Sequence, residues 1–300
     1  MNSPKNVLIT GASGMLGSAF VDILAGKDYA VRALDHAALD VTNRDAVLAE
    51  KEHAPDWIIH TAGIVNADFC EENQKTCFQS HVEGTKNIVL LAKQTGARLF
   101  YPQSFLIFDG AESPITETTV PHPLSVYGEV KWDAEQIVYA MAPHALIVRM
   151  AGFFGGDEKD KNFVGKFAKH LRKCIDNEIR TIEVGDRVWQ PTFTEDLARN
   201  SVLLLEEGKE GIYTMASKGE ASFFDVAVTM VDVFGLSNKI EIIKVSAADI
   251  ERKTRENARR PQYAEMENKR LIQERLDKMR PWREALEEYL KHDYFKDLFN

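Results

Sequence analysis

The first half of the chain alternates short apolar runs with longer amphipathic stretches. The apolar runs are rich in β-branched residues and predict strands at Asn6–Thr10, Ala30–Leu34, Trp57–His60, Leu99–Tyr101 and Leu146–Arg149. The stretches between them have helical spacing and predict helices at Met15–Ala25, Arg44–Glu52, Lys75–Thr95 and Tyr127–Met141. This alternation is a βαβ signature, and right-handed crossovers convert it into a doubly wound parallel sheet with helices on both faces. We therefore expect an α/β fold.

Three glycines at three-residue intervals, Gly11, Gly14 and Gly17, connect the first expected strand to the first expected helix. Gly11 permits a tight turn, Gly14 lets the backbone approach a pyrophosphate, and Gly17 lets helix and strand pack closely. The helix N-terminus adds free N–H groups and partial positive charge. A glycine-rich loop alone would be weak evidence. Because strand, turn, helix and second strand occur here in order, the sequence predicts a Rossmann-type dinucleotide site.

The pattern loosens in the second half of the chain. A helix is expected at Phe163–Arg172, and an apolar run at Ile212–Met215 predicts a strand that returns to the main sheet. We expect residues 1–155 to form the dinucleotide-binding domain. Residues 156–300 should form mainly a smaller, interleaved substrate lobe, with a segment near 185–235 returning to the first domain.

Asp35 ends the second expected strand, about where an acidic residue accepts hydrogen bonds from the adenosine ribose. A carboxylate at this place favours NAD over NADP. An ordinary loop aspartate is the alternative explanation, and His36 and Arg32 leave room for a 2′-phosphate. We therefore expect NAD(H) or NADP(H) as cofactor, with a slight preference for NAD(H).

Composition narrows the range of partners. A chain of 300 residues with 44% hydrophobic content can bury a large core, and a net charge of -9 argues against nucleic acid as a partner. No apolar run approaches the ~20 residues that span a bilayer, so no membrane partner is expected. The start, Met1 to Lys5, lacks the basic and apolar blocks of a signal peptide, which predicts a cytoplasmic protein.

The cysteines and histidines show no spacing typical of metal ligands. Three cysteines, Cys70, Cys77 and Cys174, are too few for a disulfide framework, and none forms a C-x-x-C pair. We expect no catalytic metal and no disulfide framework.

Tyr127 and Lys131 lie four residues apart in an expected helix, so both side chains leave the same face. A tyrosine phenol loses its proton near pH ~10, and a neighbouring ammonium stabilises the phenolate enough for Tyr127 to give a proton to a carbonyl near neutral pH. In an unselected chain, a surface pair on an amphipathic helix is the commoner explanation. Here the pair follows a dinucleotide turn at the sequence distance that reductases use, which favours catalysis.

Together, Gly11-x-x-Gly14-x-x-Gly17 and Tyr127-x-x-x-Lys131 resemble the extended short-chain dehydrogenase/reductase superfamily. Within it, the chain is similar to the dTDP-4-dehydrorhamnose reductase branch. The segments that carry this similarity run through nearly the whole chain and are Leu39-Asp-Val-Thr42, Pro55–His60, Phe108-Asp-Gly110, Pro123–Lys131, Asn162-Phe163, Pro191-Thr192 and Arg260-Pro261. The resemblance is specific for fold and cofactor and less specific for the substrate.

The resemblance implies carbonyl reduction on a nucleotide sugar. Nicotinamide gives a hydride to the carbonyl carbon, Tyr127 protonates the oxygen, Ser104 orients it, and Lys131 holds the nicotinamide ribose. Cofactor contacts are implied for the three turn glycines, for Tyr127 and Lys131, and for Ser13, Met15, Leu16, Asp35, His36, Asp40, Val41, Thr61, Ala62 and Gly63. Substrate contacts are implied for Val65, Ser104, Phe105, Asn162, Trp189 and Arg260.

The departures from this branch lie mostly on the substrate side. Phe105 stands where the branch commonly has an aspartate, and His81 where it often has an asparagine. Gly152 and Trp189 stand where the branch tends to have an aromatic residue and a glycine. These four residues alter hydrogen bonding and shape near the sugar and leave the cofactor half untouched.

Two further stretches have competing explanations. Residues 251–260 carry five cations against two carboxylates, which indicates either a clasp for a nucleotide diphosphate, supported by Arg260, or a solvated helix face. The C-terminal apolar residues have helical spacing and predict core or subunit packing rather than a membrane anchor; they are Trp282, Leu286, Tyr289, Leu290, Phe295 and Leu298. A homodimer stays open.

Two alternatives to a reductase remain. An epimerase or dehydratase of the same superfamily regenerates its cofactor within each turnover. A cofactor-binding regulatory subunit, like the β subunit of methionine adenosyltransferase, shares this architecture. Phe105 and His81 favour the regulatory subunit, whereas the intact Tyr127 and Lys131 count against it.

Overall fold

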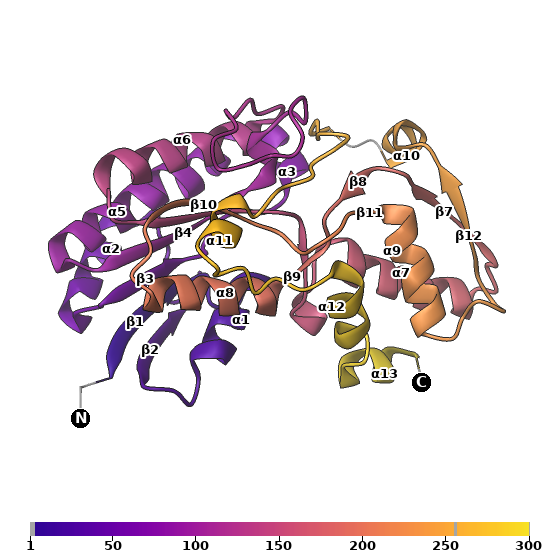
Figure 1. Cartoon of the computed structure of the whole chain (residues 1–300), viewed down its shortest axis with the longest axis horizontal. Coiled ribbons are helices and arrows are strands. Elements are labelled where there is room, and N and C mark those ends of the chain that lie inside the picture. The colour runs from indigo at the N-terminus through magenta and orange to yellow at the C-terminus, as the bar shows by residue number, and fades with distance from the viewer. Residues whose placement is uncertain (1–3, 255–256, 300) are drawn as a thin grey trace.

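The computed structural model describes residues 4–254 and 257–299 and is built on a six-stranded sheet in the order β10-β5-β4-β3-β1-β2 (Figure 1). Every pairing in this sheet is parallel. Its strands are β1 (Lys5–Thr10), β2 (Tyr29–Leu34), β3 (Trp57–His60), β4 (Arg98–Ser104), β5 (Leu146–Met150) and β10 (Gly211–Met215). The predicted doubly wound α/β fold is confirmed, and the expected strand at Ile212–Met215 joins the sheet as β10.

Helices cover both faces of the sheet because both faces of its strands are apolar. On β1, Val7 and Ile9 are buried in the core beneath one helical layer, and Leu8 is buried in the core on the opposite face. One layer consists of α1 (Met15–Leu24) and α8 (Thr194–Glu206). The other consists of α2 (Arg44–Ala49), α5 (Gly84–Thr95) and α6 (Val126–Met141) (Figure 1).

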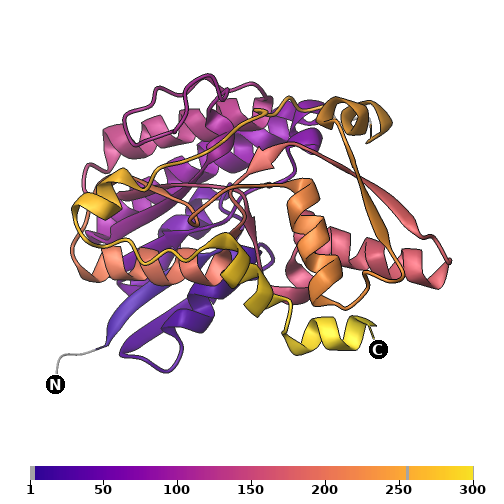
Figure 2. The same cartoon turned by 45° about the vertical axis from the view of Figure 1, so that its right-hand side comes forward.

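A second lobe has its own apolar core and lies beside one end of the sheet (Figure 2). Its helices are α7 (Phe163–Asp176), α9 (Phe223–Val233), α10 (Ala247–Thr254), α12 (Trp282–Tyr289) and α13 (Asp293–Phe299), while α11 (Lys269–Gln273) packs on β10. Paired short strands complete it: β7 (Thr181–Gly185) with β12 (Glu241–Val245), β8 (Val188–Trp189) with β11 (Ala221–Ser222), and β6 (Phe153–Phe154) with β9 (Thr192–Phe193).

The C-terminal apolar residues contribute to this lobe's core. Trp282, Leu286, Tyr289, Leu290 and Phe295 are buried in it, as their helical spacing predicts. No helix in the described ranges is long and apolar enough to cross a bilayer. The chain returns to the sheet between lobe elements, because α8 and β10 separate β8 from α9 in sequence.

The helix predicted over Lys75–Thr95 is present, but it is not α-helical throughout. The segment starts in α4 (Gln74–Phe78), passes through a π-helical turn at Gln79–Glu83 and continues as α5. His81, in this turn, is buried and its Nε2 lies 2.8 Å from the Ile64 carbonyl oxygen. A side chain on Gly63 would place its Cβ 2.6 Å from the His81 ring. The wider turn thus accompanies a contact with a residue distant in sequence, which helical periodicity does not reveal.

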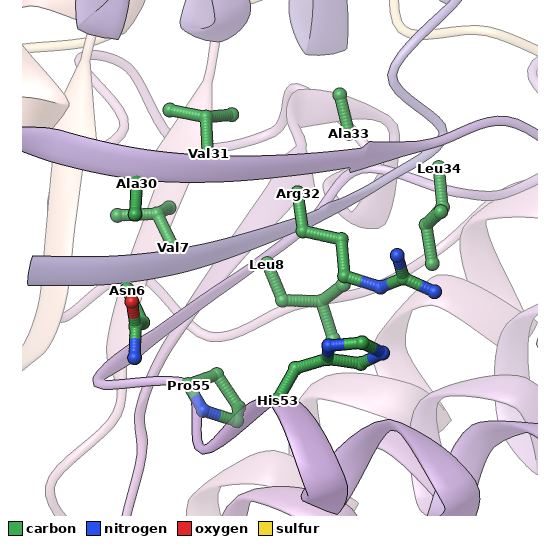
Figure 3. A pocket seen from close by; sticks show the side chains of 10 residues that line it. All are labelled: Asn6, Val7, Leu8, Ala30, Val31, Arg32, Ala33, Leu34, His53 and Pro55. Carbon is green, nitrogen blue, oxygen red and sulfur yellow. The ribbon is translucent and has the colours of Figure 1, made fainter.

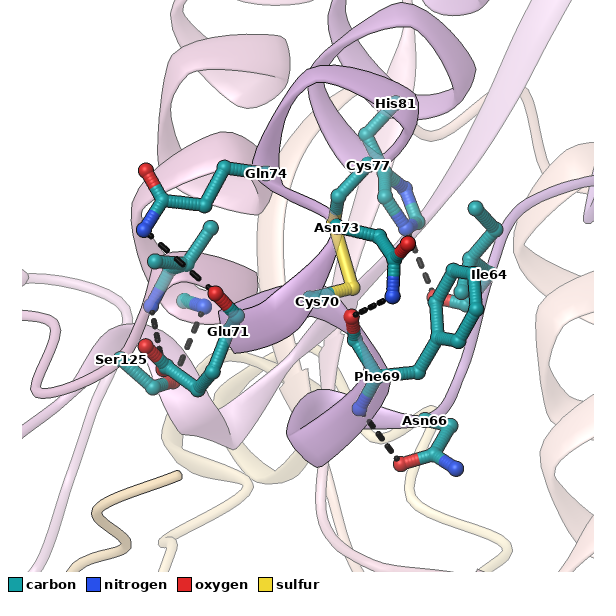
Figure 4. The surroundings of a disulfide bond; sticks show 12 residues. Ile64, Asn66, Phe69, Cys70, Glu71, Asn73, Gln74, Cys77, His81 and Ser125 are labelled. Carbon is teal, nitrogen blue, oxygen red and sulfur yellow. Dashed lines mark hydrogen bonds between the residues drawn. A yellow bond between two sulfur atoms is a disulfide. The ribbon is translucent and has the colours of Figure 1, made fainter. Parts of the chain in front are cut away.

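The cysteines form one disulfide, which the expectation of no disulfide framework did not foresee. Cys70, in α3 (Ala67–Glu72), is bonded to Cys77 in α4, and the two Cα atoms are 5.4 Å apart (Figure 4). The two short helices are joined at the non-helical residue Asn73, and the bond connects residues seven positions apart. Cys174 is a buried free thiol in the second lobe.

Candidate active site

The three glycines of the turn after β1 differ in how much room each has for a side chain. Gly11 has φ +69°, and a Cβ there would lie 2.6 Å from the Ala62 nitrogen. A side chain on Gly17 would collide with the Gly11 carbonyl oxygen. Gly14 is exposed, has ordinary φ, and would bring its Cβ no closer than 3.2 Å to the Gly11 oxygen. Gly14 is thus the exposed and least restricted of the three glycines, and its bare backbone leaves room for a ligand at the turn.

The N-terminus of α1 faces the same place. Gly14 is its N-cap residue and offers no side-chain cap, and no acidic residue lies in the first turn. The first-turn amides of Met15, Leu16 and Gly17 have no acceptor within the helix and carry partial positive charge. These amides and the bare Gly14 backbone fit the diphosphate of a dinucleotide.

A cavity of about 350 Å³ continues from this turn to the end of β2. Its lining residues are Ala12, Ser13, Ser18, Val21, Asp22, Ala33, Asp35, Ala38 and Lys159. The Ala38 amide donates to Asp35 Oδ1 across 2.9 Å, so one carboxylate oxygen already caps the chain's own turn. Asp35 thus lies where an adenosine ribose would be expected, with part of its hydrogen-bonding capacity used.

Arg32 lies on the opposite face of β2. Its guanidinium donates twice to Glu50, at 2.6 Å from Nε and 3.0 Å from Nη2. It lines a second, open depression of about 500 Å³ with His53 and Pro55 (Figure 3). Because neighbouring side chains on a strand alternate between faces, Arg32 does not share the cavity of Asp35.

The residues after β3 line the back of the glycine turn. Thr61 Oγ1 donates to the Thr10 carbonyl oxygen across 2.7 Å. Ala62 packs against Gly11 so closely that Gly11 has no room for a Cβ, and Gly63 is pressed on His81. Three predicted cofactor residues, Thr61, Ala62 and Gly63, therefore lie beside the turn.

The remaining predicted cofactor residues follow β2. Asp40 Oδ1 accepts from the amide and hydroxyl of Thr42, and these hydrogen bonds lower the pKa of the Asp40 carboxyl. Val41 is buried against Gly84, the first residue of α5. His36 is exposed. Asp40 and Val41 thus shape the loop after β2.

Ser104 and Tyr127 come together at the carboxyl edge of the sheet. Ser104 ends β4, and Tyr127 lies in the first turn of α6. Burial raises the pKa of Tyr127 to about 12, and a hydrogen bond with Ser104 opposes this rise. The start of α6 is held by Ser125, whose Oγ accepts from the Gly128 amide at 3.2 Å, and by Glu71, which accepts from the Val126 amide at 2.9 Å (Figure 4).

Lys131 is buried one turn further along α6. Its ammonium donates to the Tyr101 hydroxyl at 3.0 Å and to the Pro102 carbonyl oxygen at 2.7 Å. Burial lowers the pKa of Lys131 to about 7, and Glu135 opposes this fall. No hydrogen bond among the described residues joins Lys131 to Tyr127, so the electrostatic help from Lys131 to the phenol stays a prediction.

Three of the four departing residues, Phe105, Gly152 and Trp189, meet in the structure. Trp189 is buried and stacks on Phe223, with ring centroids 5.1 Å apart. A Cβ on Gly152 would lie 2.7 Å from the Trp189 ring and 3.4 Å from Phe105. The indole thus fills the space that a side chain at position 152 would need.

The other predicted substrate residues, Val65, Asn162 and Arg260, differ in exposure and in the contacts that they make. Val65 is 63% exposed on the loop after β3. The Asn162 amide donates to the Phe153 carbonyl oxygen at 2.7 Å, and the Arg260 guanidinium pairs with Asp68 at 2.7 Å. Asn162 and Arg260 therefore hold the chain's own backbone and side chains in this structure.

Two of the described cations of residues 251–260 are paired with carboxylates outside that stretch. Arg252 pairs with Asp249 and Lys253 with Glu183, while Arg255 lies outside the described residues. These ion pairs favour the solvated-face explanation for that part of the stretch. Across the described chain, no three His, Cys, Asp or Glu side chains are grouped to hold a metal ion.

Two residues of the site went unnoticed in the sequence. The Tyr101 hydroxyl accepts a hydrogen bond from the Lys131 ammonium, but in the sequence Tyr101 looks like any aromatic residue of a buried strand. Lys159 lines the cavity of Asp35, although it belongs to the second lobe. The only local signal for Lys159 is the glycine- and charge-rich connection in which it lies.

The chain is similar to known proteins over nearly its whole length. The sequence profile of the RmlD substrate binding domain matches residues 5–295. A dTDP-4-dehydrorhamnose reductase of Mycolicibacterium smegmatis is 29% identical over 288 residues, covering 95% of this chain and 84% of the relative. The crystal structure of a dTDP-4-dehydrorhamnose reductase ortholog from Clostridium acetobutylicum is 32% identical, with a TM-score of 0.87 and coverage of 95% and 98%. A Bacillus anthracis dTDP-4-dehydrorhamnose reductase in complex with NADP is 28% identical, with a TM-score of 0.85 and the same coverage.

Proposed function

The chain belongs to the RmlD substrate binding domain family, and on this premise we propose that it reduces the 4-keto group of a nucleotide-linked sugar. It uses a nicotinamide dinucleotide as reductant. The observation that carries the proposal is the meeting of Ser104 and Tyr127 at the carboxyl edge of the sheet. A substrate carbonyl placed there would find a hydroxyl to orient it and a phenol to protonate it.

The division of labour follows from the positions of the residues. The bound cofactor supplies the hydride. The Ser104 hydroxyl orients the carbonyl oxygen, and the Tyr127 hydroxyl donates the proton that this oxygen takes up. Burial of Tyr127 limits its exchange of protons with water and holds the phenol protonated until a carbonyl arrives.

Lys131 supports this step from the adjacent turn of α6. Two of its three N–H donors are taken by Tyr101 and Pro102. The third is left for the nicotinamide ribose or the phenol. Because the pKa of Lys131 is lowered to about 7 by burial, the ammonium depends on such acceptors to stay charged.

Residues 1–155 bind the dinucleotide, and residues 156–300 mainly hold the sugar nucleotide, with a segment near 185–235 returning to the first domain. The remaining carboxylate oxygen of Asp35 accepts from the adenosine ribose and gives NAD(H) a slight advantage.

The proposal is tested by a screen of nucleotide-4-keto sugars with NADH and with NADPH, followed by identification of the product. Stoichiometric loss of the reduced cofactor's absorbance together with a 4-hydroxy product is expected. Conversion of a sugar without net absorbance change would identify an epimerase instead. Binding of dinucleotide with no turnover of any sugar, together with co-purification of a catalytic partner, would replace the proposal with a regulatory subunit.

A further inference from the structure

A segment of the second lobe crosses onto the glycine turn. The Lys161 amide lies 3.4 Å from the Met15 sulfur, in the first turn of α1. A Cβ on Gly156 would lie 3.5 Å from the Met15 Cα. The connection from Gly155 to Lys161 therefore packs on the N-terminal end of the helix that offers its amides to the dinucleotide.

The lobe holds this segment through a buried acid. Asp160 is 1% exposed, and its carboxylate accepts from the Gly155 amide at 3.1 Å and from the Tyr289 hydroxyl at 3.3 Å. The Tyr289 hydroxyl in turn accepts from the Asp157 amide at 3.0 Å, and Asp157 Oδ1 lies 3.0 Å from His292 Nδ1. These contacts with the end of α12 and the residues after it fix the path of the segment over the turn.

This path brings one cation to the cavity at the end of β2. Among the described residues that line the cavity of about 350 Å³, Lys159 carries the single positive charge, and Asp22 and Asp35 carry the carboxylates. Lys159 is exposed, and no ion pair of the described residues includes Lys159 or Asp35. Arg32 is held by Glu50 on the other face of β2. Lys159 is thus the ammonium available to a ligand at this place.

We propose that Lys159 binds the 2′-phosphate of NADP(H) and lets the protein accept NADPH in spite of Asp35. The inference rests on the proposed function, because it takes the dinucleotide to lie on the Gly11–Gly17 turn with its adenosine ribose at the end of β2. A phosphate there would be repelled by the Asp35 carboxylate, and an ammonium in the same cavity offsets that repulsion. NADH has no 2′-phosphate and gains little from Lys159.

Equilibrium binding without sugar substrate tests this directly. The fluorescence of NADH and of NADPH is titrated with wild-type protein, Lys159→Ala, Lys159→Glu and the control Lys161→Ala. Lys161 lies in the same segment, is exposed and does not line the cavity. We expect Lys159→Ala to weaken NADPH binding about tenfold and NADH binding less than about twofold, with a larger loss of NADPH for Lys159→Glu and no change for Lys161→Ala.

Three outcomes would overturn the assignment. Equal losses for both cofactors would show that Lys159 serves the diphosphate. Unchanged binding in both Lys159 variants would show that Lys159 contacts neither the 2′-phosphate nor the diphosphate. An equal loss of NADPH binding in Lys161→Ala would show that the effect comes from the net positive charge of the segment and not from Lys159 in particular. Failure of the wild-type protein to bind either dinucleotide would instead sink the proposed function, so the two failures are distinguishable.

Discussion

The Lys131 ammonium donates a hydrogen bond to the Tyr101 hydroxyl across 3.0 Å, and it also lies 4.2 Å from the centroid of the Tyr101 ring. Burial raises the pKa of Tyr101 well above its usual value, and a hydrogen bond with Thr85 opposes this rise. Thr85 Oγ1 lies 3.2 Å from His60 Nε2, which continues the buried polar chain beneath the site. Tyr101 thus positions the lysine from the sheet.

Tyr101→Phe keeps the ring beneath the ammonium and removes the hydrogen-bonding oxygen. We expect a three- to tenfold fall in kcat, about the effect of one hydrogen bond to a charged group. Tyr139→Phe is the control, because Tyr139 lies on α6, the helix that carries Lys131, and is 63% exposed. Steady-state kinetics on a substrate from the screen measure both variants, and equal rates in all three proteins would remove Tyr101 from the site.

Tyr127→Phe removes the proton donor and keeps the ring. Turnover should fall on the order of a hundredfold or more with little loss of cofactor binding. Lys131→Met should impair both turnover and cofactor affinity, because the ammonium is lost from the phenol and from the ribose together. Turnover and cofactor affinity are measured separately for each variant. Wild-type turnover in Tyr127→Phe would show that another group is the acid.

Gly14→Val and Gly17→Ala should fail in different ways. Position 14 is exposed and a Cβ there would approach the Gly11 oxygen to 3.2 Å, against 2.2 Å at position 17, so Gly14→Val should fold and lose dinucleotide affinity. A methyl group at position 17 meets the Gly11 carbonyl and Thr61 Oγ1, so Gly17→Ala should destabilise the fold by about 1 to 3 kcal/mol. Urea unfolding and fluorescence titration separate the two effects. A folded Gly14→Val with unchanged NADH and NADPH affinity would contradict the cofactor assignment.

The stability of the protein should fall as the solution becomes acidic. Burial lowers the pKa of both His60 and His81 to about 3, whereas an unfolded histidine titrates near 6.5. Between these values the histidines of the unfolded chain are protonated, whereas the two folded rings stay neutral. Their contribution to the free energy of unfolding is therefore fully present above pH ~6.5 and is lost toward pH ~3. Each ring contributes about 1.4 kcal/mol per pH unit in this window.

His81→Asn should make that acid dependence shallower by one proton. Urea unfolding at pH values from about 7 down to about 5 gives the slope, with His144→Asn as the control, since the His144 side chain is 83% exposed. An unchanged slope in His81→Asn would mean that His81 is protonated in the folded protein. His60→Gln provides a second variant of the same kind if His81→Asn is too unstable to measure.

The fold class could be predicted from the sequence because it depends on local periodicity. Apolar runs of strand length, helical spacing between them and a glycine turn after the first strand are properties of neighbouring residues. They predicted the sheet, and the match of β1 and α1 to Asn6–Thr10 and Met15–Ala25 is within a residue. The π-helical turn between α4 and α5 could not be predicted, because the contact of His81 with Gly63 and Ile64 joins residues far apart in the chain.

The site residues likewise fall into those that local sequence spacing predicts and those that only tertiary contacts reveal. Tyr127 and Lys131 could be found because four residues of helix put them on one face, and the turn glycines because their spacing is local. The partner of Lys131 comes from a neighbouring strand, and Lys159 reaches the end of β2 from the second lobe. Only the tertiary structure determines these two contacts, because each joins residues distant in sequence, and strand order and lobe packing bring such residues together.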